Sequence, residues 1–462
     1  MGNCRHFRNC GLTDKADPEN HLCILHSQNR KKEWNEFYAT LETHRKRSSD
    51  FSLFFFPGEG DFFEAEFDQD ASFFGVTFNG EAMFHLAKFH GRATFEKATF
   101  GGEAGFGGAN FEKTANFDEV TFRGEAYFHD ATFGDGAGFS SVKFTTANFI
   151  GSVFKGGVQF DLGNFGGEAD FSWATFGKRV EFHRSTFSGE TSFVGTRFAE
   201  KGASFRFSSF RARARFASGE MDGEHTRIFS RVDVDFRDVA VEPPGAVTFV
   251  EADLRRCRFL GTNLEYLRFT GVKWPRTSDG RRDALHDESV SGKNDQSGPL
   301  AQIEDLYRQV KKSYEGQRDY ERASDFHYGE KEMRRRNPGT RKGLWALLWL
   351  YRNLSGYGEE YLRPLVWSSI LLAVSAAGYL YFGLQVKDGK TTLAFQQMKT
   401  WSTDSLWVLG KGLFYSFRVM TLLRPDDLEP LRWGQLIHAA QSLLGPLLLG
   451  LAGLAIRQRL RR

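Results

Sequence analysis

Residues 124–133 read Gly-Glu-Ala-Tyr-Phe-His-Asp-Ala-Thr-Phe, and this pattern recurs through the first half of the chain. Phenylalanine returns at intervals of five and six residues from Phe67 to Phe198, and an alanine often stands two positions before it. A short, sustained period is typical of a stacked solenoid rather than of a globular core. Positions i and i−2 of an extended strand share one face, so we expect the Phe and Ala side chains to fill the interior.

The spacing becomes strictly five from Phe249 to Trp274, a stretch that includes Ala252-Asp253-Leu254. This pattern resembles the pentapeptide-repeat family. The resemblance implies a right-handed quadrilateral β-helix with four repeats per coil over residues 60–274, with the central Phe or Leu pointing inward. About nine or ten coils, stacked ~4.8 Å apart, would form a rod of roughly 45 Å that bulges locally where a residue is inserted.

The charge balance bears on what the outer faces of this rod could bind. The chain has 61 Lys and Arg against 58 Asp and Glu, a net charge of +3. Members of the family that imitate duplex DNA need a strongly acidic surface, so we expect neither DNA mimicry nor a nucleic-acid partner here. Arg211, Arg213 and Arg215 alternate, which predicts three guanidinium groups on one strand face. That outer basic face would bind an anion or a protein partner, or would simply be solvated.

The N-terminal 30 residues form a head rich in cysteine and histidine. Its spacing, C-x5-C-x12-C-x2-H, supplies three thiolates and one imidazole, which predicts a closed structural zinc site without catalytic function. The chain opens with polar and charged residues and no secretory signal, which favours metal ligands over disulfides. The predicted ligands are Cys4, Cys10, Cys23 and His26, with His6 and His21 as alternatives.

Two apolar stretches, Leu365–Leu384 and Leu436–Ile456, are each long enough to cross the hydrocarbon core of a membrane. Basic residues precede the first stretch, and residues 457–462 are basic after the second, so the positive-inside rule places both termini in the cytoplasm. The repeat family implies a bacterial origin and hence the inner membrane. The alternative is a buried helix pair of a globular domain.

Trp345 and Trp349 lie on one face of a short helix that is either interfacial or ordinarily packed.

The segment between the two spans, residues 405–430, resembles the pore loop of potassium-type channels: an amphipathic re-entrant helix followed by a polar turn. The resemblance implies a pore built from Ser416, Arg418, Thr421, Leu422, Leu423, Arg424, Asp426 and Asp427. Leu422-Leu423-Arg424-Pro425-Asp426 stands where that family has Thr-Val-Gly-Tyr-Gly. Stacked backbone carbonyls need those glycines, so we do not expect potassium selectivity. Arg418 and Arg424 would favour anions if they face a lumen, or else extend to lipid headgroups.

The complete predicted architecture combines a β-solenoid with α-helices. Its segments are a zinc-binding head (1–30), an amphipathic helix (31–50), the β-helix (60–274), a flexible linker (275–300), a helical hairpin (301–340), and an interfacial helix with a two-span pore-like membrane domain (341–462).

Two spans from one chain cannot enclose a conduit, so the resemblance to channels implies a homo-oligomer, most simply a tetramer. We therefore predict a membrane ion channel or channel-like effector with a cytoplasmic sensor domain. The alternative is a non-conducting, membrane-anchored scaffold whose β-helix binds a protein partner. The sequence contains no nucleophile elbow, phosphate-binding glycine loop or HExxH motif, so we expect no enzymatic activity.

Overall fold

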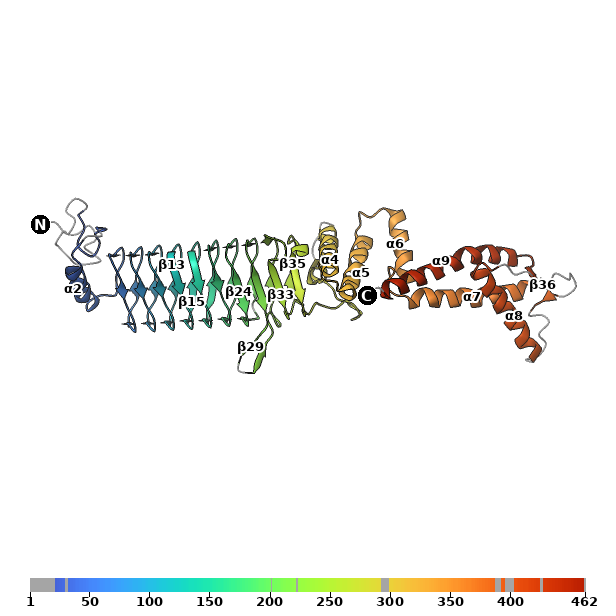
Figure 1. Ribbon diagram of the computed structural model, residues 1–462, viewed down its shortest axis with the longest axis horizontal. Helices are drawn as coiled ribbons and strands as arrows, with labels where there is room; N and C mark the ends of the chain where they lie inside the picture. Colours follow the sequence, from blue (N-terminus) through green and yellow to red (C-terminus); the bar gives the residue numbers. More distant parts are fainter. Residues whose placement is uncertain are drawn as a thin grey trace. The chain divides into compact units, whose positions relative to one another are not determined.

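The computed structural model of the protein describes residues 21–29, 32–200, 202–221, 223–291, 299–386, 392–394, 403–423 and 427–460 (Figure 1). The chain divides into two compact units, Met1–Arg318 and Asp319–Arg462. The first holds the repeats and the second holds the apolar helices, and each is described by itself.

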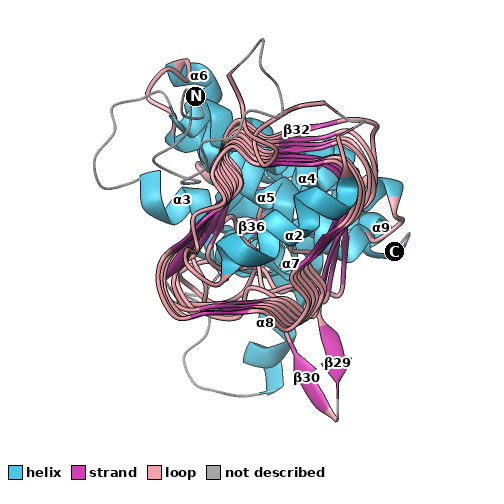
Figure 2. Ribbon diagram, turned by 90° about the vertical axis from the view of Figure 1, so that its left-hand side faces the viewer, coloured by secondary structure: helices cyan, strands magenta, loops and turns pink. Residues whose placement is uncertain are grey.

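The first unit is a β-solenoid that begins at β1 (Phe55–Phe56) and ends at β35 (Leu267–Thr270). Its strands are short and pair in parallel with the strand one coil away, as in β3 (Glu66–Phe67), β7 (Lys88–Phe89) and β11 (Asn110–Phe111). Their phenylalanines lie 22 residues apart on successive coils. Seen from one end, the coils superpose as a four-sided tube (Figure 2). The predicted β-helix is therefore confirmed.

Phenylalanine rings fill the interior of the solenoid. Phe84 and Phe106, one coil apart, stack with centroids 4.9 Å apart and planes at 4°. Phe73 on the adjoining face meets Phe84 edge-on, at 5.2 Å and 89°. All three rings are fully buried. Stacked and T-shaped pairs are the two favoured aromatic geometries, so the square cross-section satisfies both: one along the axis and one between faces.

The inserted residues are accommodated as the repeat spacing predicts. β13 (Thr121–Tyr127) pairs with β16 (Lys143–Asn148), and the register shifts between Phe122 and Glu125. One extra residue on one strand of a pair is a β-bulge, which turns the chain without breaking the stack.

Helices cover both ends of the solenoid and protect the strand edges that open coils would expose. At the N-terminal end, Phe37 of α2 (Trp34–Arg45) is fully buried, and Lys32 Nζ donates to the carbonyl of Phe55 at 2.6 Å. At the C-terminal end lies α4 (Pro299–Gly316), where Tyr314 OH accepts a 2.8 Å hydrogen bond from Trp274 Nε1.

The segment expected to be a flexible linker, residues 275–300, is different in the structure. It contains α3 (His286–Ser291), and Leu285 just before this helix is buried. The Asp287 carboxylate accepts the backbone N–H groups of Phe259 and Leu260 at 3.0 and 3.2 Å. The side chain therefore caps the last coil, a role that the polar composition alone does not reveal. Residues 292–298 lie outside the described part of the chain.

The second unit consists of helices and a small antiparallel sheet. The helices are α5 (Tyr320–Arg336), α6 (Lys342–Ser355), α7 (Leu362–Phe382), α8 (Thr403–Met420) and α9 (Gly434–Leu460). The sheet joins β36 (Leu384–Val386) to β37 (Thr392–Leu393) and to β38 (Leu428–Pro430). The two helices expected to form a hairpin, α4 and α5, are both present but belong to different units.

Among the described residues, two helices are long and apolar enough to cross a membrane: Leu362–Phe382, and residues Gly434–Arg457 of α9. Only 28% of each apolar window is buried within the chain. The core helices of water-soluble proteins bury their apolar surface, so this exposure favours a lipid or an oligomeric environment.

Candidate functional site

The most unusual geometry in the second unit is the position at which α8 ends. Ser416, near its C-terminus, donates to the carbonyl of Leu372 at 2.9 Å, and Leu372 is the midpoint of α7. Met420, its last residue, lies against Gly445, where an added Cβ would meet Met420 Cγ at 2.7 Å. Gly445 is near the middle of α9. α8 therefore stops halfway along the two apolar helices.

After α8 the chain returns to the end at which α7 terminates. Leu422 has a φ of 59°, a left-handed conformation that turns the backbone sharply. β38 then pairs with β36, which follows α7 directly, with Leu384 opposite Pro430. α8 ends against the middle of both apolar helices, and β38 lies back beside the end of α7; residues 424–426 between them are outside the described part of the chain.

A buried polar network holds α8 in place. Gln441 of α9 accepts a 2.8 Å hydrogen bond from Tyr379 OH through Oε1, and its Nε2 donates to Ser416 Oγ at 2.6 Å. Gln441, Ser416 and Tyr379 are all fully buried. Beside them, Tyr415 OH lies 3.1 Å from His438 Nδ1. One side chain from each of α7, α8 and α9 thus meets in a single chain of hydrogen bonds.

The sequence analysis did not predict that Tyr379 and Gln441 hold α8 in place. The available signal was a polar amide inside an apolar stretch, because polar groups in candidate spans usually carry structural or functional weight. Ser416 was predicted as a pore residue. Within one chain it lies inside the α7–α8–α9 joint and faces no open space.

The other predicted pore residues divide into three groups. Leu422 and Leu423 are 64% and 55% exposed, and Asp427 is exposed just before β38. Thr421 continues the helix end, where its Oγ1 donates to the carbonyl of Phe417 at 2.8 Å, and the half-buried Arg418 guanidinium lies 5.8 Å from the ring of Phe414. Arg424 and Asp426 lie outside the described residues.

A second polar centre connects the helices that precede the first apolar helix. The buried Glu332 carboxylate of α5 binds Arg335 at 2.8 Å and Arg336 at 3.0 Å, and it accepts a hydrogen bond from Tyr357 OH at 3.1 Å. Arg352 of α6 lies 3.6 Å away. Burial alone would raise the pKa of Glu332, but the hydrogen bond from Arg335 and the surrounding guanidinium charges lower it to about 2.

This centre also reaches the start of α7, since Arg363 donates to the carbonyl of Arg352 at 3.0 Å and pairs with Glu360. The sequence showed the arginines only as a basic run. Their common carboxylate partner becomes visible only when α5 and α6 pack together.

α6 itself is largely exposed. Trp345 and Trp349 are 44% and 47% exposed, and Leu347 is 61% exposed. The expectation of an interfacial helix remains a prediction, and this exposed apolar surface is what it requires.

The structure places two of the four predicted zinc ligands together. Cys23 Sγ lies 3.1 Å from His26 Nδ1, and both residues are buried at the N-terminal end of the solenoid. A thiolate and an imidazole nitrogen are suitable donors for zinc. Cys4 and Cys10 lie outside the described residues.

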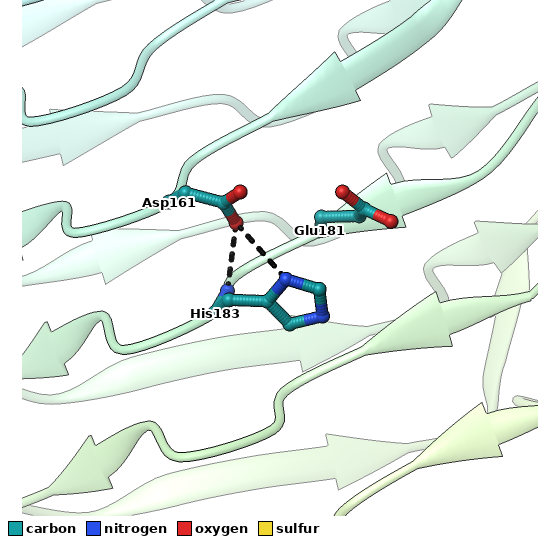
Figure 3. A group of neighbouring side chains, drawn as sticks. All are labelled: Asp161, Glu181 and His183. Carbon is teal, nitrogen blue, oxygen red and sulfur yellow. Dashed lines mark hydrogen bonds and ion pairs between the residues drawn. The ribbon is translucent and has the colours of Figure 1, made fainter.

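Another group of potential metal ligands lies on the outer surface of the solenoid (Figure 3): Asp161, Glu181 and His183, whose ligand atoms lie within 4.8 Å of one another. Asp161 already accepts the backbone N–H of His183 at 2.9 Å, and Glu181 pairs with Arg179 at 2.6 Å. His183 Nε2 lies 2.6 Å from Ser204 Oγ. Asp118 makes the same cross-coil bond to Ser140 at 2.7 Å, so we interpret the group as a brace between coils.

The outer basic face is arranged differently from the prediction. Arg211, Arg213 and Arg215 are exposed, but only Arg215 lies in a strand, β28 (Ala214–Ala217). Strands in this solenoid span only a few residues, so a five-residue stretch turns a corner. Arg213 lies 3.9 Å from Glu190 on the neighbouring coil.

Residues 73–121 and 117–162 match the profile of pentapeptide repeats (9 copies). Residues 73–162 of the solenoid are pentapeptide repeats. The matched residues lie within the stacked phenylalanine coils, and the match confirms the resemblance to pentapeptide repeats. No curated protein and no solved structure matches the chain significantly. For the helical unit, the functional argument therefore depends on its own geometry.

Proposed function

We propose that this chain assembles into a homo-oligomeric membrane ion channel, or a channel-like effector, without potassium selectivity. The pentapeptide-repeat solenoid would act as its cytoplasmic sensor domain. The observation that carries the proposal is the end of α8 at mid-length of two apolar helices, with a chain return to the same end. In a bilayer this geometry is that of a re-entrant pore loop, and non-helical backbone at such depth is tolerated only where it is covered by protein or lines a water-filled space.

The exposed apolar surface supports both the proposed membrane location and the proposed oligomer. α7 and α9 leave most of their apolar windows uncovered, so lipid or other copies must cover them. One chain with two spans cannot surround a conduit, so several copies would be required, and a tetramer is the simplest arrangement. Basic residues before α7 and after α9 favour cytoplasmic termini, and with a bacterial origin the membrane would be the inner one.

The polar centre at Glu332 suggests how a signal would reach the pore. It ties α5 and α6 to the first turn of α7 through Arg352 and Arg363. A displacement of α5 would therefore pull on the candidate span. The predicted zinc site at Cys4, Cys10, Cys23 and His26 would stabilise the N-terminal head, where Cys23 and His26 already lie in contact.

The direct test is reconstitution of the full-length chain in liposomes, with flux of K⁺, Na⁺ and Cl⁻ measured separately. We expect flux that does not favour K⁺. Replacing Gln441 by Leu should reduce it by removing the α8 joint, whereas Gln435→Leu, at an exposed position near the start of the same helix, should leave it unchanged. No flux of any ion from a verified oligomer would refute the channel.

A non-conducting, membrane-anchored scaffold is the second candidate. Leu422 and Leu423 are exposed where a selectivity filter would need glycine backbone, which favours this alternative. The solenoid would then bind a protein partner. Particle mass in mild detergent separates the two candidates, since a stable monomer supports the anchor and a ring supports the pore.

A further inference from the structure

One outer face of the solenoid carries a groove with unpaired positive charge. Four strands stack there in parallel: β24 (Thr191–Val194), β28, β33 (Val247–Val250) and β35. Their register aligns Arg215, Thr248 and Arg268 in one outward row. The groove has a volume of about 450 Å³.

This row of side chains has an exposed arginine at each end, Arg215 and Arg268. Arg213 at the rim approaches Glu190, but within the described chain no carboxylate pairs with Arg215 or Arg268, both exposed. They lie two coils apart, which is roughly 10 Å at the usual strand spacing. A guanidinium group binds carboxylates through two parallel hydrogen bonds, so the groove offers two such positions.

The groove also determines what kind of anion would fit. Glu168 and Glu190 line one end of the groove, on the coils before Arg215, so a continuous polyanion such as nucleic acid would meet repulsion at that end. A narrow segment with separate carboxylates avoids this repulsion. A short acidic protein segment is therefore the matching chemistry.

The chain itself carries such a segment. β29 (Gly219–Met221) and β30 (Glu224–Thr226) form an antiparallel hairpin that directly follows β28. Its strands contain Glu220 and Glu224, and Glu220 is exposed. The hairpin projects beyond the square outline of the solenoid at one corner, away from the body of its own chain (Figures 1 and 2). Its length is roughly 10 Å.

The base of the hairpin is firmly attached. His225 Nε2 lies 3.0 Å from Glu251 Oε2, and both Ser218 Oγ and Arg227 donate to the carbonyl of Glu251, at 2.8 and 2.9 Å. Gly219 packs against Trp173, whose ring leaves no room for a Cβ. The hairpin is thus presented outward as a fixed projection.

We infer that the groove of one copy receives the β29–β30 hairpin of a neighbouring copy of the same chain. This inference rests on the proposed homo-oligomer. It identifies a contact between copies that lies in the solenoid rather than in the apolar helices. The hairpin and the groove belong to adjoining coils. If copies are arranged around an axis parallel to the solenoid, the hairpin of one copy therefore lies level with the groove of the next. Such a head-to-tail contact gives a ring when the rotation between neighbouring copies closes, as the proposed oligomer requires. Glu220 would pair with the exposed arginines, and no covalent chemistry is involved.

The test uses cysteine cross-linking of the full-length chain in mild detergent, with Met221→Cys in the hairpin and Thr248→Cys in the groove. Oxidation should give covalent multimers on a denaturing gel. Each variant with only one of the two new cysteines serves as a control, because any multimers it forms must involve a native cysteine or two copies of the same new cysteine. The matched control pairs Met221→Cys with Arg258→Cys on β34 (Cys257–Arg258), which belongs to another face of the solenoid, and should give no multimers.

Charge exchange then tests the pairing itself. Glu220→Arg alone, or Arg215→Glu with Arg268→Glu, should lower the cross-linking yield about fivefold, and the three changes together should restore it. An oligomer by mass without cross-linking, or a yield that charge reversal leaves unchanged, overturns this inference and leaves the channel intact. A monomer by mass overturns the proposed oligomer as well.

Discussion

The two units of this protein bury their side chains by different rules. In the solenoid, Phe84 contacts Phe106 one coil away and Phe73 on the next face, and the same contacts repeat along the axis. In the helical unit, single polar side chains such as Gln441 and Glu332 each organise several elements. Repetition spreads stability over many equivalent contacts, whereas the helical unit concentrates it in a few.

The comparison indicates how each unit should respond to a single substitution. A coil of the solenoid that loses one ring loses a large buried contact, but the loss stays within the neighbouring coils. A helix joint that loses its amide leaves buried partners without hydrogen bonds, which is costly in an apolar surrounding.

Removing one interior ring should destabilise the solenoid most. Phe106→Ala deletes a fully buried ring that stacks on Phe84 and Phe128, and we expect a loss of about 4 kcal/mol. Phe63→Ala, at a 53% exposed ring, is the matched control and should have little effect. Chemical unfolding followed by the β-sheet circular dichroism signal measures both. Equal losses for the two variants would contradict the interior packing.

Neutralising Glu332 should loosen the helical unit by about 3 kcal/mol, because three arginines and Tyr357 would lose their common partner. Glu321→Gln, at an exposed position of the same helix, is the control. Thermal unfolding of the helical signal in detergent is the measurement. The idea fails if both variants melt alike.

The same carboxylate predicts an acid dependence. Its pKa is lowered on folding to about 2, so the stabilisation is present above the unfolded value of about 4.3 and disappears as pH falls towards 2. The Glu332→Gln variant should lack this component. Its stability difference from the native chain should therefore shrink as the pH is lowered from 5 to about 2.

Breaking the joint between α7, α8 and α9 should have a smaller effect on stability. Gln441→Leu removes the hydrogen bond from Tyr379 OH and the two that the amide donates to Ser416, at Oγ and at the backbone carbonyl, which costs about 2 kcal/mol. Gln435→Leu serves as the exposed control. The melting temperature in detergent reports the change. An unchanged melting temperature for Gln441→Leu would mean that α8 is held by other contacts.

The smallest effect concerns an exposed brace between three coils of the solenoid. His90 bonds to Glu66 and Glu112, both at 2.9 Å, and these bonds raise the pKa of the imidazole. A raised pKa means that the brace is complete below about 6.5 and is lost as pH rises through the folded value. An NMR titration should show a higher His90 pKa than in the Glu66→Gln variant. If His90 titrates identically in both proteins, the hydrogen bond between His90 and Glu66 does not stabilise the charged imidazole.

Much of the architecture could be predicted from the amino-acid sequence. The five- and six-residue spacing of phenylalanine determines which side chains share a strand face, and this fixes the solenoid before any tertiary contact is known. The two apolar stretches could also be identified from the sequence, because their length and local composition can be compared directly with the thickness of a bilayer. The pairing of Cys23 with His26 followed from a spacing of three residues.

The candidate sites depend on contacts between residues far apart in the chain, and such contacts become known only when the packing of the helices and coils is known. Ser416 meets Leu372 and Gln441 across three helices, and Glu332 gathers arginines from α5 and α6. The groove at Arg215 and Arg268 exists because coils stack in register. Periodicity encodes neighbours at fixed sequence separation. It carries no information about where one helix ends against the middle of another, since that depends on packing of side chains brought together by the fold.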